Sequence, residues 1–400
     1  MLKSELVDVI HSQAGEARAN LGMTRDLLQT LPSLPRFATI VTGVRRCGKS
    51  TLLQQWAHAS GLNVVSLSFD DLRLMTFTPQ DFILLGKIIS EEGAEAVILD
   101  EVQDLDGWER FVNGLLTQGI RVLVTGSNAK MLSRELGTKL TGRHLDFHLN
   151  PFSYREFIRY KKLDKSHDSF VTYLQMGGFP AYVATGNKQI LIELFNDIIY
   201  RDIVVRYRIT NATPIKQLAG YLLAHIGTCI SPSRLKDAIH VQSAKTVLDY
   251  FDHLTECCLL CRLEQYAASP KARLLAQKKV YACDTALAAL FEHGKTINLG
   301  HKLENVLFCH LKRGAKDITY YRDSNNYECD FVVENEHGDF SLVQVCYELT
   351  EENREREFRG LASAATFFGV KKGVIVTFNQ CDEAVYDGCE ISIIPAFEFL

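Results

Sequence analysis

A glycine-rich run between an apolar strand pattern and a helical pattern constrains the fold of this 400-residue chain most strongly. The run, Gly43–Ser50, has the form Gly-x-x-x-x-Gly-Lys-Ser, and a helix is expected to begin near Lys49. Its glycines let backbone N–H groups turn inward toward phosphate oxygens, and the helix N-terminus adds a favourable dipole. The sequence therefore predicts a phosphate-binding loop. The residues expected around the phosphates are Gly43, Val44, Arg45, Arg46, Cys47, Gly48, Lys49, Ser50 and Thr51.

The roles of individual residues in this loop follow from their side-chain chemistry. Lys49 carries a point charge that would reach the β- and γ-phosphates of a bound nucleotide. Ser50 offers its hydroxyl to a magnesium ion, and Thr51 is the neighbouring, lesser candidate for that contact. The expected cofactors are therefore ATP and Mg²⁺.

Two carboxylates after the apolar segment 97–99 supply the second half of the expected site. Asp100, at the end of a strand, would lie near the magnesium, usually through water. Glu101 would then be free to polarise the attacking water. The chain between Lys49 and Asp100 has room for a further strand and helix, an arrangement found in ATPases that carry a catalytic glutamate.

Polar residues farther along the chain extend this prediction. The strand pattern 121–126 leads into Ser127 and Asn128, and either side chain would sense the γ-phosphate by hydrogen bonding. The alternative is a simple strand-to-turn transition. Arg143 follows a glycine turn; in a ring of subunits it would reach a neighbour's γ-phosphate, and otherwise it is a surface arginine that pairs locally. The residues assigned to catalysis are Glu101, Lys49 and Arg143.

Composition restricts the class of protein and its location. A hydrophobic content of 46% with 23% charged residues is typical of a globular protein, and this length suggests two or three domains. The net charge of −4 argues against binding to nucleic acid by bulk charge alone. No apolar run reaches bilayer length and the first residues lack a signal-peptide pattern, so we expect a cytoplasmic protein with no membrane partner.

The 11 cysteines are irregularly spaced and lie mostly in apolar stretches, which is a poor pattern for disulfides. Reduced thiols packed as small apolar groups are therefore expected. Cys258 and Cys261 have the spacing of metal ligands but lack a second pair. Packing is the preferred interpretation of these two, with zinc binding or redox chemistry as the alternative.

Strand and helix patterns divide the chain into four segments. Residues 1–35 form a helical lead-in, and residues 36–212 contain alternating strands and helices, which predicts a parallel α/β sheet with a helical extension. Residues 213–270 show three short amphipathic helices followed by an apolar run, in the manner of a winged helix. Residues 271–400 make up the last segment. The strands expected in the second segment are 38–42, 63–69, 96–100, 121–126 and 144–149.

Several motifs carry a resemblance that covers nearly the whole chain. They are Gly43–Ser50, Phe69–Asp71, Leu99–Glu101, Thr125–Ser127, Leu140–Arg143, Pro151–Phe157, Gly177–Pro180, Leu303–Asn305 and Gln344–Leu349. In these the sequence resembles a large family of bacterial and archaeal AAA+-type P-loop ATPases. The resemblance implies an ATPase core of the AAA+ type, a winged-helix middle domain and a C-terminal α+β domain similar to restriction endonucleases (PD-(D/E)xK-like).

The nuclease-like order of the last segment implies a metal site that is degenerate in this chain. In that fold a helix glutamate, a strand aspartate and a Glu-x-Lys hold magnesium and activate water. Glu304 matches the helix acid and Asp330 the strand acid, but Gln344 and Cys346 stand where the glutamate and lysine would be. Gln344 is a weak metal ligand and Cys346 lacks the positive charge of lysine. A nuclease fold without nuclease activity is therefore expected.

The middle segment leaves binding to DNA open. The helix that begins near Ser243 occupies the place of a recognition helix. Its exposed residues would include Lys245, Asp249 and Asp252, which do not form a basic stripe. Reading of DNA by this helix and a purely structural or protein-binding role are equally compatible with the sequence.

Three functions compete on this basis. The first is an ATP-hydrolysing switch or motor that forms a homo-oligomer and acts on nucleic acid or in defence or stress. The second is a metal-dependent DNA nuclease gated by ATP, favoured by Glu304 and Asp330 and opposed by Gln344 and Cys346. The third is a non-enzymatic regulator whose DNA- or protein-binding winged helix responds to the bound nucleotide.

Overall fold

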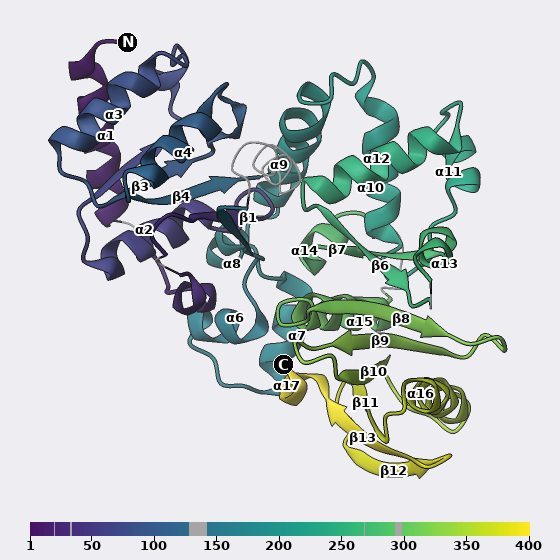
Figure 1. The fold of residues 1–400 in the computed structure, drawn as a ribbon. Helices are drawn as coiled ribbons and strands as arrows, with labels where there is room; N and C mark the ends of the chain where they lie inside the picture. Colours follow the sequence, from purple (N-terminus) through teal and green to yellow (C-terminus); the bar gives the residue numbers. More distant parts are fainter. Residues whose placement is uncertain (20, 33, 128–141, 268, 293–297) are drawn as a thin grey trace. The chain divides into compact units, whose positions relative to one another are not determined.

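A computed structural model describes residues 1–400 except for residues 20, 33, 128–141, 268 and 293–297 (Figure 1). The chain divides into two compact units. The first contains Met1–Asn150 and Glu256–Cys258, and the second contains Pro151–Thr255 and Leu259–Leu400.

The first unit is built on a five-stranded parallel sheet of order β2-β3-β4-β1-β5. This confirms the predicted parallel sheet, and each observed strand agrees with its predicted segment to within one residue at either end. Because β4 lies between β1 and β3, the carboxyl ends of these three strands are neighbours at one edge of the sheet. The strands are β1 (Ala38–Thr42), β2 (Val64–Ser68), β3 (Ala96–Asp100), β4 (Arg121–Gly126) and β5 (His144–His148).

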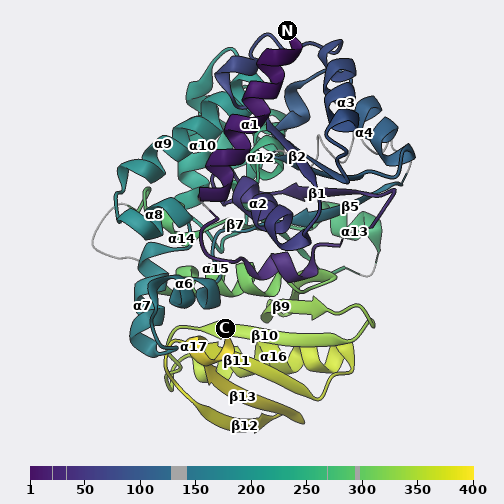
Figure 2. The ribbon, with the colours of Figure 1, turned by 90° about the vertical axis from the view of Figure 1, so that its left-hand side faces the viewer.

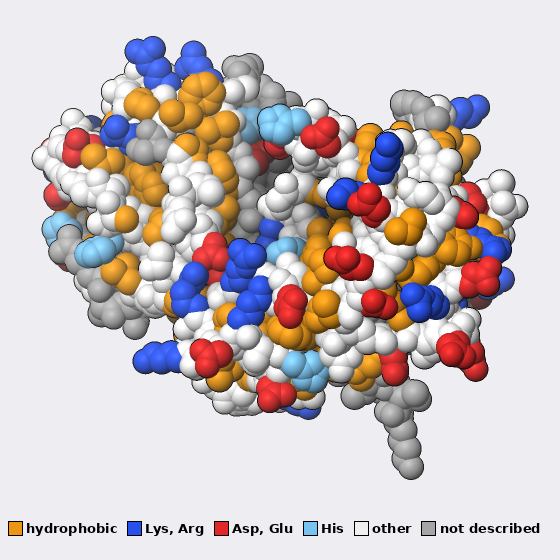
Figure 3. Space-filling view, turned by 90° about the horizontal axis from the view of Figure 1, so that it is seen from below, with side chains coloured by type: hydrophobic (Ala, Val, Ile, Leu, Met, Phe, Trp, Pro, Cys, Tyr) orange, Lys and Arg blue, Asp and Glu red, His pale blue; other side chains and the backbone are white. Residues whose placement is uncertain are grey.

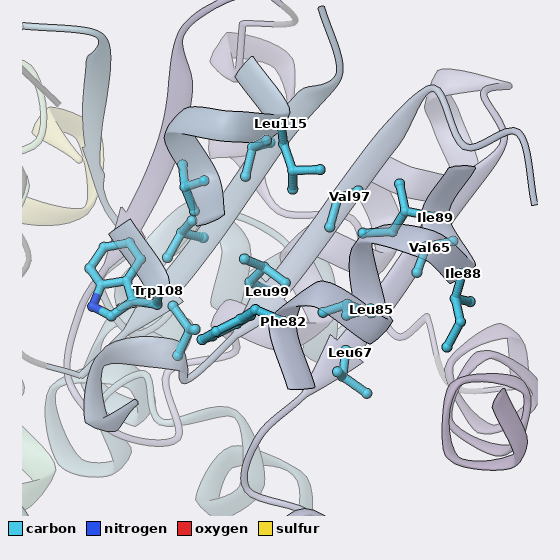
Figure 4. Close-up of a cluster of buried hydrophobic side chains, with 14 of the residues drawn as sticks. Val65, Leu67, Phe82, Leu85, Ile88, Ile89, Val97, Leu99, Trp108 and Leu115 are labelled. Carbon is cyan, nitrogen blue, oxygen red and sulfur yellow. The ribbon is translucent and has the colours of Figure 1, made fainter. Parts of the chain in front are cut away.

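A buried apolar layer covers one face of this sheet. Side chains of α3 (Asp81–Glu91) and α4 (Trp108–Thr117) pack onto alternate residues of β2 and β3, as Figure 4 shows. The first helix, α1 (Lys3–Ala19), adds Leu6 and Ile10 to the same layer, so the helical lead-in is part of this core. The remaining helical elements of the unit are η1 (Asp26–Thr30), α2 (Lys49–Ser60), η2 (Leu72–Leu74) and η3 (Val102–Asp104).

The second unit begins with helices. Serine side chains cap the first two, since Ser153 and Ser166 each form a capping box that satisfies free backbone N–H groups. The helices are α6 (Tyr154–Lys161), α7 (His167–Met176), α8 (Pro180–Thr185), α9 (Gln189–Asp197), the π-helix η4 (Ile198–Val205), α10 (Ala212–Ala224), α11 (Pro232–Ala238) and α12 (Ala244–Glu256).

An eight-stranded mixed sheet forms the rest of the second unit, in the order β12-β13-β11-β10-β9-β8-β6-β7. The helix α16 (Arg354–Phe368) packs against its central strands, and α15 (Leu299–Leu311) packs against β7 and β10 (Figures 1 and 2). The strands are β6 (Leu260–Gln265), β7 (Lys278–Ala282), β8 (Asp317–Arg322), β9 (Glu328–Glu334), β10 (Phe340–Cys346), β11 (Lys372–Thr377), β12 (Asp382–Tyr386) and β13 (Cys389–Pro395). The short helices of this part are α13 (Pro270–Leu275), α14 (Thr285–Ala288) and α17 (Ala396–Phe399).

Two domain boundaries differ from those expected. The helices between residues 151 and 212 lie in the second unit, because α7 and α9 pack against α14. The expected boundary at residue 270 separates β6 from β7, although these strands pair antiparallel with Leu260 opposite Ala282. Three helices do precede β6, but β6 and β7 belong to the eight-stranded sheet, so assignment of 213–270 as a winged helix stays a prediction.

None of the helices in the described part of the chain has both the length and the apolar character that a membrane crossing requires. None of the 11 cysteines, all of which lie among the described residues, forms a disulfide, and Cys258 and Cys261 are buried.

Candidate nucleotide site

The glycine-rich run forms a loop between β1 and α2, and two of its glycines are required by the backbone. Gly43 has φ 149° and Gly48 has φ 102°, values that residues with a side chain rarely adopt. A Cβ on Gly43 would lie 2.2 Å from the carbonyl oxygen of Leu149, just after β5. The loop therefore passes directly against the chain that leaves β5, and Gly48 starts the helix α2.

A buried arginine supports this loop from behind. The Arg25 guanidinium donates to the carbonyl of Cys47 at 2.8 Å and to that of Asn150 at 2.7 Å, and Arg25 is 3% exposed. The Cys47 thiol donates to the carbonyl of Leu149 at 3.3 Å, and burial raises its pKa, so it stays protonated at neutral pH. Cys47 is thus a packing residue of the loop. Arg25 was not predicted, since nothing in the local sequence distinguishes it from a surface arginine.

Lys49 extends back over the loop toward the acidic pair. Its Nζ lies 3.2 Å from the carbonyl oxygen of Gly43 and 3.3 Å from Oε1 of Glu101. Burial disfavours its charge, but Glu101, Cys47 and Asp100 outweigh burial and raise its pKa. Lys49 therefore holds a fixed positive charge inside the loop. The other two basic residues of the loop are less buried than Lys49. Arg45 is half-buried, with its guanidinium 3.9 Å from the carboxylate of Asp70, and Arg46 is exposed.

Asp100 is held at the end of β3 by three hydroxyl donors. Ser50 donates to Oδ1 at 3.0 Å and Ser68 to Oδ2 at 2.9 Å, and Thr125 also donates to Oδ1. Burial and the neighbouring Glu101 raise the pKa of Asp100, while the three hydroxyls oppose this. The hydroxyl of Ser50 and the carboxylate of Asp100 are hard oxygen groups side by side, which fits the ligands and outer partners of Mg²⁺.

Glu101 follows in a left-handed conformation, with φ 54°. Its backbone N–H donates to Thr125 Oγ1 at 3.0 Å, and its carboxylate accepts from Gln103 Nε2 at 2.8 Å. Burial would raise the pKa of Glu101, but Lys49 and Gln103 outweigh burial and lower it. Glu101 is therefore ionised at neutral pH, and its orientation is fixed by Gln103, which the sequence analysis did not identify.

The structure brings Lys49, Ser50, Asp100 and Glu101 together, as the sequence predicts. Of the remaining assignments, Thr51 is half-buried beside Ser50. Ser127, directly after β4, is 1% exposed, and its hydroxyl has no hydrogen-bond partner among the described residues.

Asn128, the other proposed sensor, lies outside the described residues. Arg143 is exposed immediately before β5, and its carbonyl accepts from the Ala38 N–H at 3.0 Å. Sensing by Ser127 and Asn128 and the trans role of Arg143 stay predictions.

The four residues assigned to the degenerate nuclease site lie in the second unit. Glu304 of α15 and Asp330 of β9 both contact Lys279 of β7, a residue the sequence analysis did not assign to the site. Gln344 accepts from the Asp330 N–H at 3.1 Å and donates to Glu357 at 2.6 Å. The Cys346 thiol donates to the carbonyl of Glu348 at 3.2 Å.

A five-stranded parallel sheet with a phosphate-binding loop after β1 and an acidic pair after β3 defines the first unit as a P-loop NTPase-like domain. Residues 35–158 match the family model of the AAA domain. The second unit matches two further family models, a domain of unknown function (DUF8612) over residues 167–296 and another (DUF4143) over residues 299–398. An AAA domain supports a nucleotide-binding, ATPase-like protein.

Relatives with similarity along most of the chain come from an archaeon and a bacterium. Uncharacterized protein MJ1544 of Methanocaldococcus jannaschii is 29% identical over 355 residues, which cover 83% of this chain and 79% of that protein. An uncharacterized protein of Haemophilus influenzae is 27% identical over 379 residues, covering 89% of this chain and 92% of that protein.

Solved structures also match, with low overall similarity. AMPPCP-bound DnaA from Aquifex aeolicus has a TM-score of 0.26 and 15% identity, over 58% of this chain and 85% of that one. The Hsp104–casein complex of S. cerevisiae, in its extended conformation, has a TM-score of 0.33 and 12% identity, over 65% of this chain and 60% of that one.

Proposed function

We propose that this chain is a Mg²⁺-dependent ATPase of the AAA+ type that works as a homo-oligomer. The observation that carries the proposal is the contact between Lys49 and Glu101 across the loop, beside an aspartate held by three hydroxyls. Lys49 would bind the terminal phosphates, and Ser50 and Asp100 would hold the metal. The magnesium would supply positive charge that stabilises the phosphate oxygens during transfer.

Glu101 is proposed to orient and polarise the water that attacks the γ-phosphate. Because the pKa of Glu101 is lowered, its carboxylate is ionised and accepts hydrogen bonds at neutral pH, as this role requires. A γ-phosphate in the loop would compete with Glu101 for Lys49, and Gln103 would then keep the released carboxylate in place. The buried hydroxyl of Ser127, which has no hydrogen-bond partner among the described residues, would serve as a donor to that phosphate.

The test of the catalytic assignment is Glu101→Gln, with Glu92→Gln, at the exposed C-cap of α3, as the matched control. Loss of the base is expected to lower the rate of phosphate release by about 100-fold or more. Binding of a fluorescent ATP analogue should survive, because Lys49 and the loop remain. Unchanged phosphate release in the variant would remove Glu101 from catalysis.

The oligomeric proposal rests on Arg143, which is exposed and so available to a neighbouring subunit. Arg143→Ala and Lys49→Ala are each expected to abolish hydrolysis alone. Mixing the two variants should restore part of the activity, because some interfaces then pair an intact Arg143 with an intact Lys49. Arg110→Ala, an exposed arginine of α4, is the control. A mixture that stays inactive while the wild type is oligomeric would exclude the trans role.

The charges on α12 do not favour nucleic acid as the partner. On α12, Lys245 and Asp249 are exposed and Asp252 pairs with Arg262, so this helix presents charges of both signs. The face of the molecule in Figure 3 likewise carries Lys and Arg side chains together with Asp and Glu side chains. Phosphate release measured with and without duplex, single-stranded and branched DNA tests the point, and stimulation by one form would identify it as the partner.

A further inference from the structure

A polar cavity of about 500 Å³ opens on the sheet of the second unit. It is lined by acidic and basic side chains from several elements, among them Lys279, Glu304, Arg322, Glu328, Asp330 and Arg356. The first of these comes from β7 and has no counterpart among the four residues that the sequence assigns to the nuclease-like site.

The ammonium of Lys279 lies within hydrogen-bond distance of three carboxylates. Its Nζ is 2.7 Å from Glu328, 2.9 Å from Glu304 and 3.0 Å from Asp330, and Lys279 is 4% exposed. Burial disfavours its charge, but Glu304, Asp330 and the other acidic neighbours outweigh burial and raise the pKa of Lys279 well above its usual value. The group is a permanent cation enclosed by acids.

The remaining polar groups of the cluster are already committed to partners within the protein. Tyr281 donates to the same oxygen of Glu304 at 2.6 Å, and the Val345 N–H donates to the second oxygen of Asp330 at 3.1 Å. Gln344, in the place of a metal-binding glutamate, uses both ends of its amide on Asp330 and Glu357. A divalent cation would have to displace the ammonium and several hydrogen bonds to reach these oxygens.

We infer that the Lys279 ammonium takes the place of the divalent cation in this carboxylate cluster. The positive charge of Lys279 balances the negative charges of the carboxylates, so the nuclease-like site binds no metal ion. The residues present do not fit the magnesium site that the resemblance implies. In the described part of the chain, no group of three or more acidic, histidine or cysteine side chains is arranged to hold a metal ion. The inference is independent of the proposed ATPase and counts against an ATP-gated nuclease.

Binding of Mn²⁺ to the full-length protein without nucleotide tests the inference. Free Mn²⁺ is followed by electron paramagnetic resonance in wild type, Asp330→Asn, Lys279→Met and Lys279→Met/Asp330→Asn. The control is Lys278→Met, the same change at the preceding position of β7, where the ammonium contacts the carbonyl of Leu274. Mn²⁺ held by the phosphate loop is the same with and without the Asp330→Asn change, so it cancels when wild type is compared with Asp330→Asn and Lys279→Met with the double variant.

The wild type is expected to bind the same amount of Mn²⁺ as Asp330→Asn. Lys279→Met should bind one further ion, which the added Asp330→Asn change removes, whereas Lys278→Met should match the wild type. Wild-type Mn²⁺ binding that is lost in Asp330→Asn would overturn the inference. So would a folded Lys279→Met protein that gains no Mn²⁺. If Lys279→Met does not fold, the comparison of wild type with Asp330→Asn still decides.

Discussion

Replacement of Gly43 by alanine probes the close approach between the phosphate loop and the chain after β5. An added Cβ would lie 2.2 Å from the Leu149 carbonyl oxygen, whereas ordinary contacts begin at 3.4 Å. The obstacle is backbone, and Arg25 fixes its neighbourhood by donating to the carbonyl of Asn150. Either the loop or the chain after β5 must therefore move by more than an ångström.

The expected cost has two parts. Overpacking of a tightly packed region costs about 1–3 kcal/mol. An alanine at φ 149°, a backbone region that favours glycine, adds about 1–3 kcal/mol. The first unit should thus lose about 2–6 kcal/mol, which lowers its Tm by at least about 4 °C. The matched control is Gly114→Ala, at an exposed position of α4 with nothing within 4 Å, which should stabilise the helix by about 0.5–1 kcal/mol.

Tryptophan fluorescence reports this loss selectively. The chain has 2 tryptophans, Trp56 and Trp108, and both are buried in the first unit. Urea unfolding followed by their emission therefore measures this unit and not the second. If Gly43→Ala unfolds at the same urea concentration as the parent while Gly114→Ala shifts upward as expected, the contact with Leu149 does not exist as described.

Two further predictions concern one residue in each unit. Gln103→Ala, which removes the side chain that orients Glu101, should slow phosphate release by about 10- to 100-fold without loss of nucleotide binding, as measured by the two assays used for Glu101. Asp284 accepts from the Gly178 and Ala286 N–H groups, and burial raises its pKa to about 6. Because the folded state binds this proton more tightly, Asp284 contributes stability that is fully present below the unfolded pKa and is lost as pH rises through 6. Between pH 7 and pH 4.5 this proton adds about 2 kcal/mol to the free energy of unfolding of the wild type, and Asp284→Asn should lack that contribution. Unfolding of both proteins followed by far-UV circular dichroism measures the difference. An identical pH dependence in the two proteins would contradict the raised pKa of Asp284.

Local patterns account for what the sequence predicted correctly. The five strands of the first sheet are short apolar runs bounded by polar residues, and each appears where expected. The proximity of Lys49, Ser50, Asp100 and Glu101 was predictable because the loop and the acidic pair each follow a strand directly. The parallel sheet then places the carboxyl ends of β1 and β3 at one edge. Residues that directly follow these strands could therefore be predicted to lie close together.

Contacts between distant parts of the chain account for what was missed. Arg25 reaches Cys47 and Asn150, and Lys279 reaches Glu304 and Asp330, but none of these pairs shares a local motif. The resemblance places the positive charge of the nuclease-like site at the position of Cys346, whereas the structure supplies it from Lys279 on another strand.

The start of one helix was wrong for a different reason. Thr350 and the two glutamates that follow it predict a helix that begins at Glu351 with Thr350 as its N-cap, but α16 begins at Arg354 behind Asn353, whose side chain accepts from the Thr350 N–H. Residues 351–353 form a turn in which the Arg354 N–H donates to the carbonyl of Thr350, and the N-cap preference of a single residue does not distinguish this turn from a first helical turn.

The pairing of β6 with both β7 and β8 has a practical consequence for dividing this protein. The two family matches in the second unit meet between residues 296 and 299, yet β6 and β7 on one side of that point share a sheet with β8 on the other. A fragment that starts at residue 299 would expose β8 as an unprotected edge and leave Glu304 and Asp330 without their counter-ion, which invites aggregation. A soluble C-terminal fragment should therefore begin before Leu260.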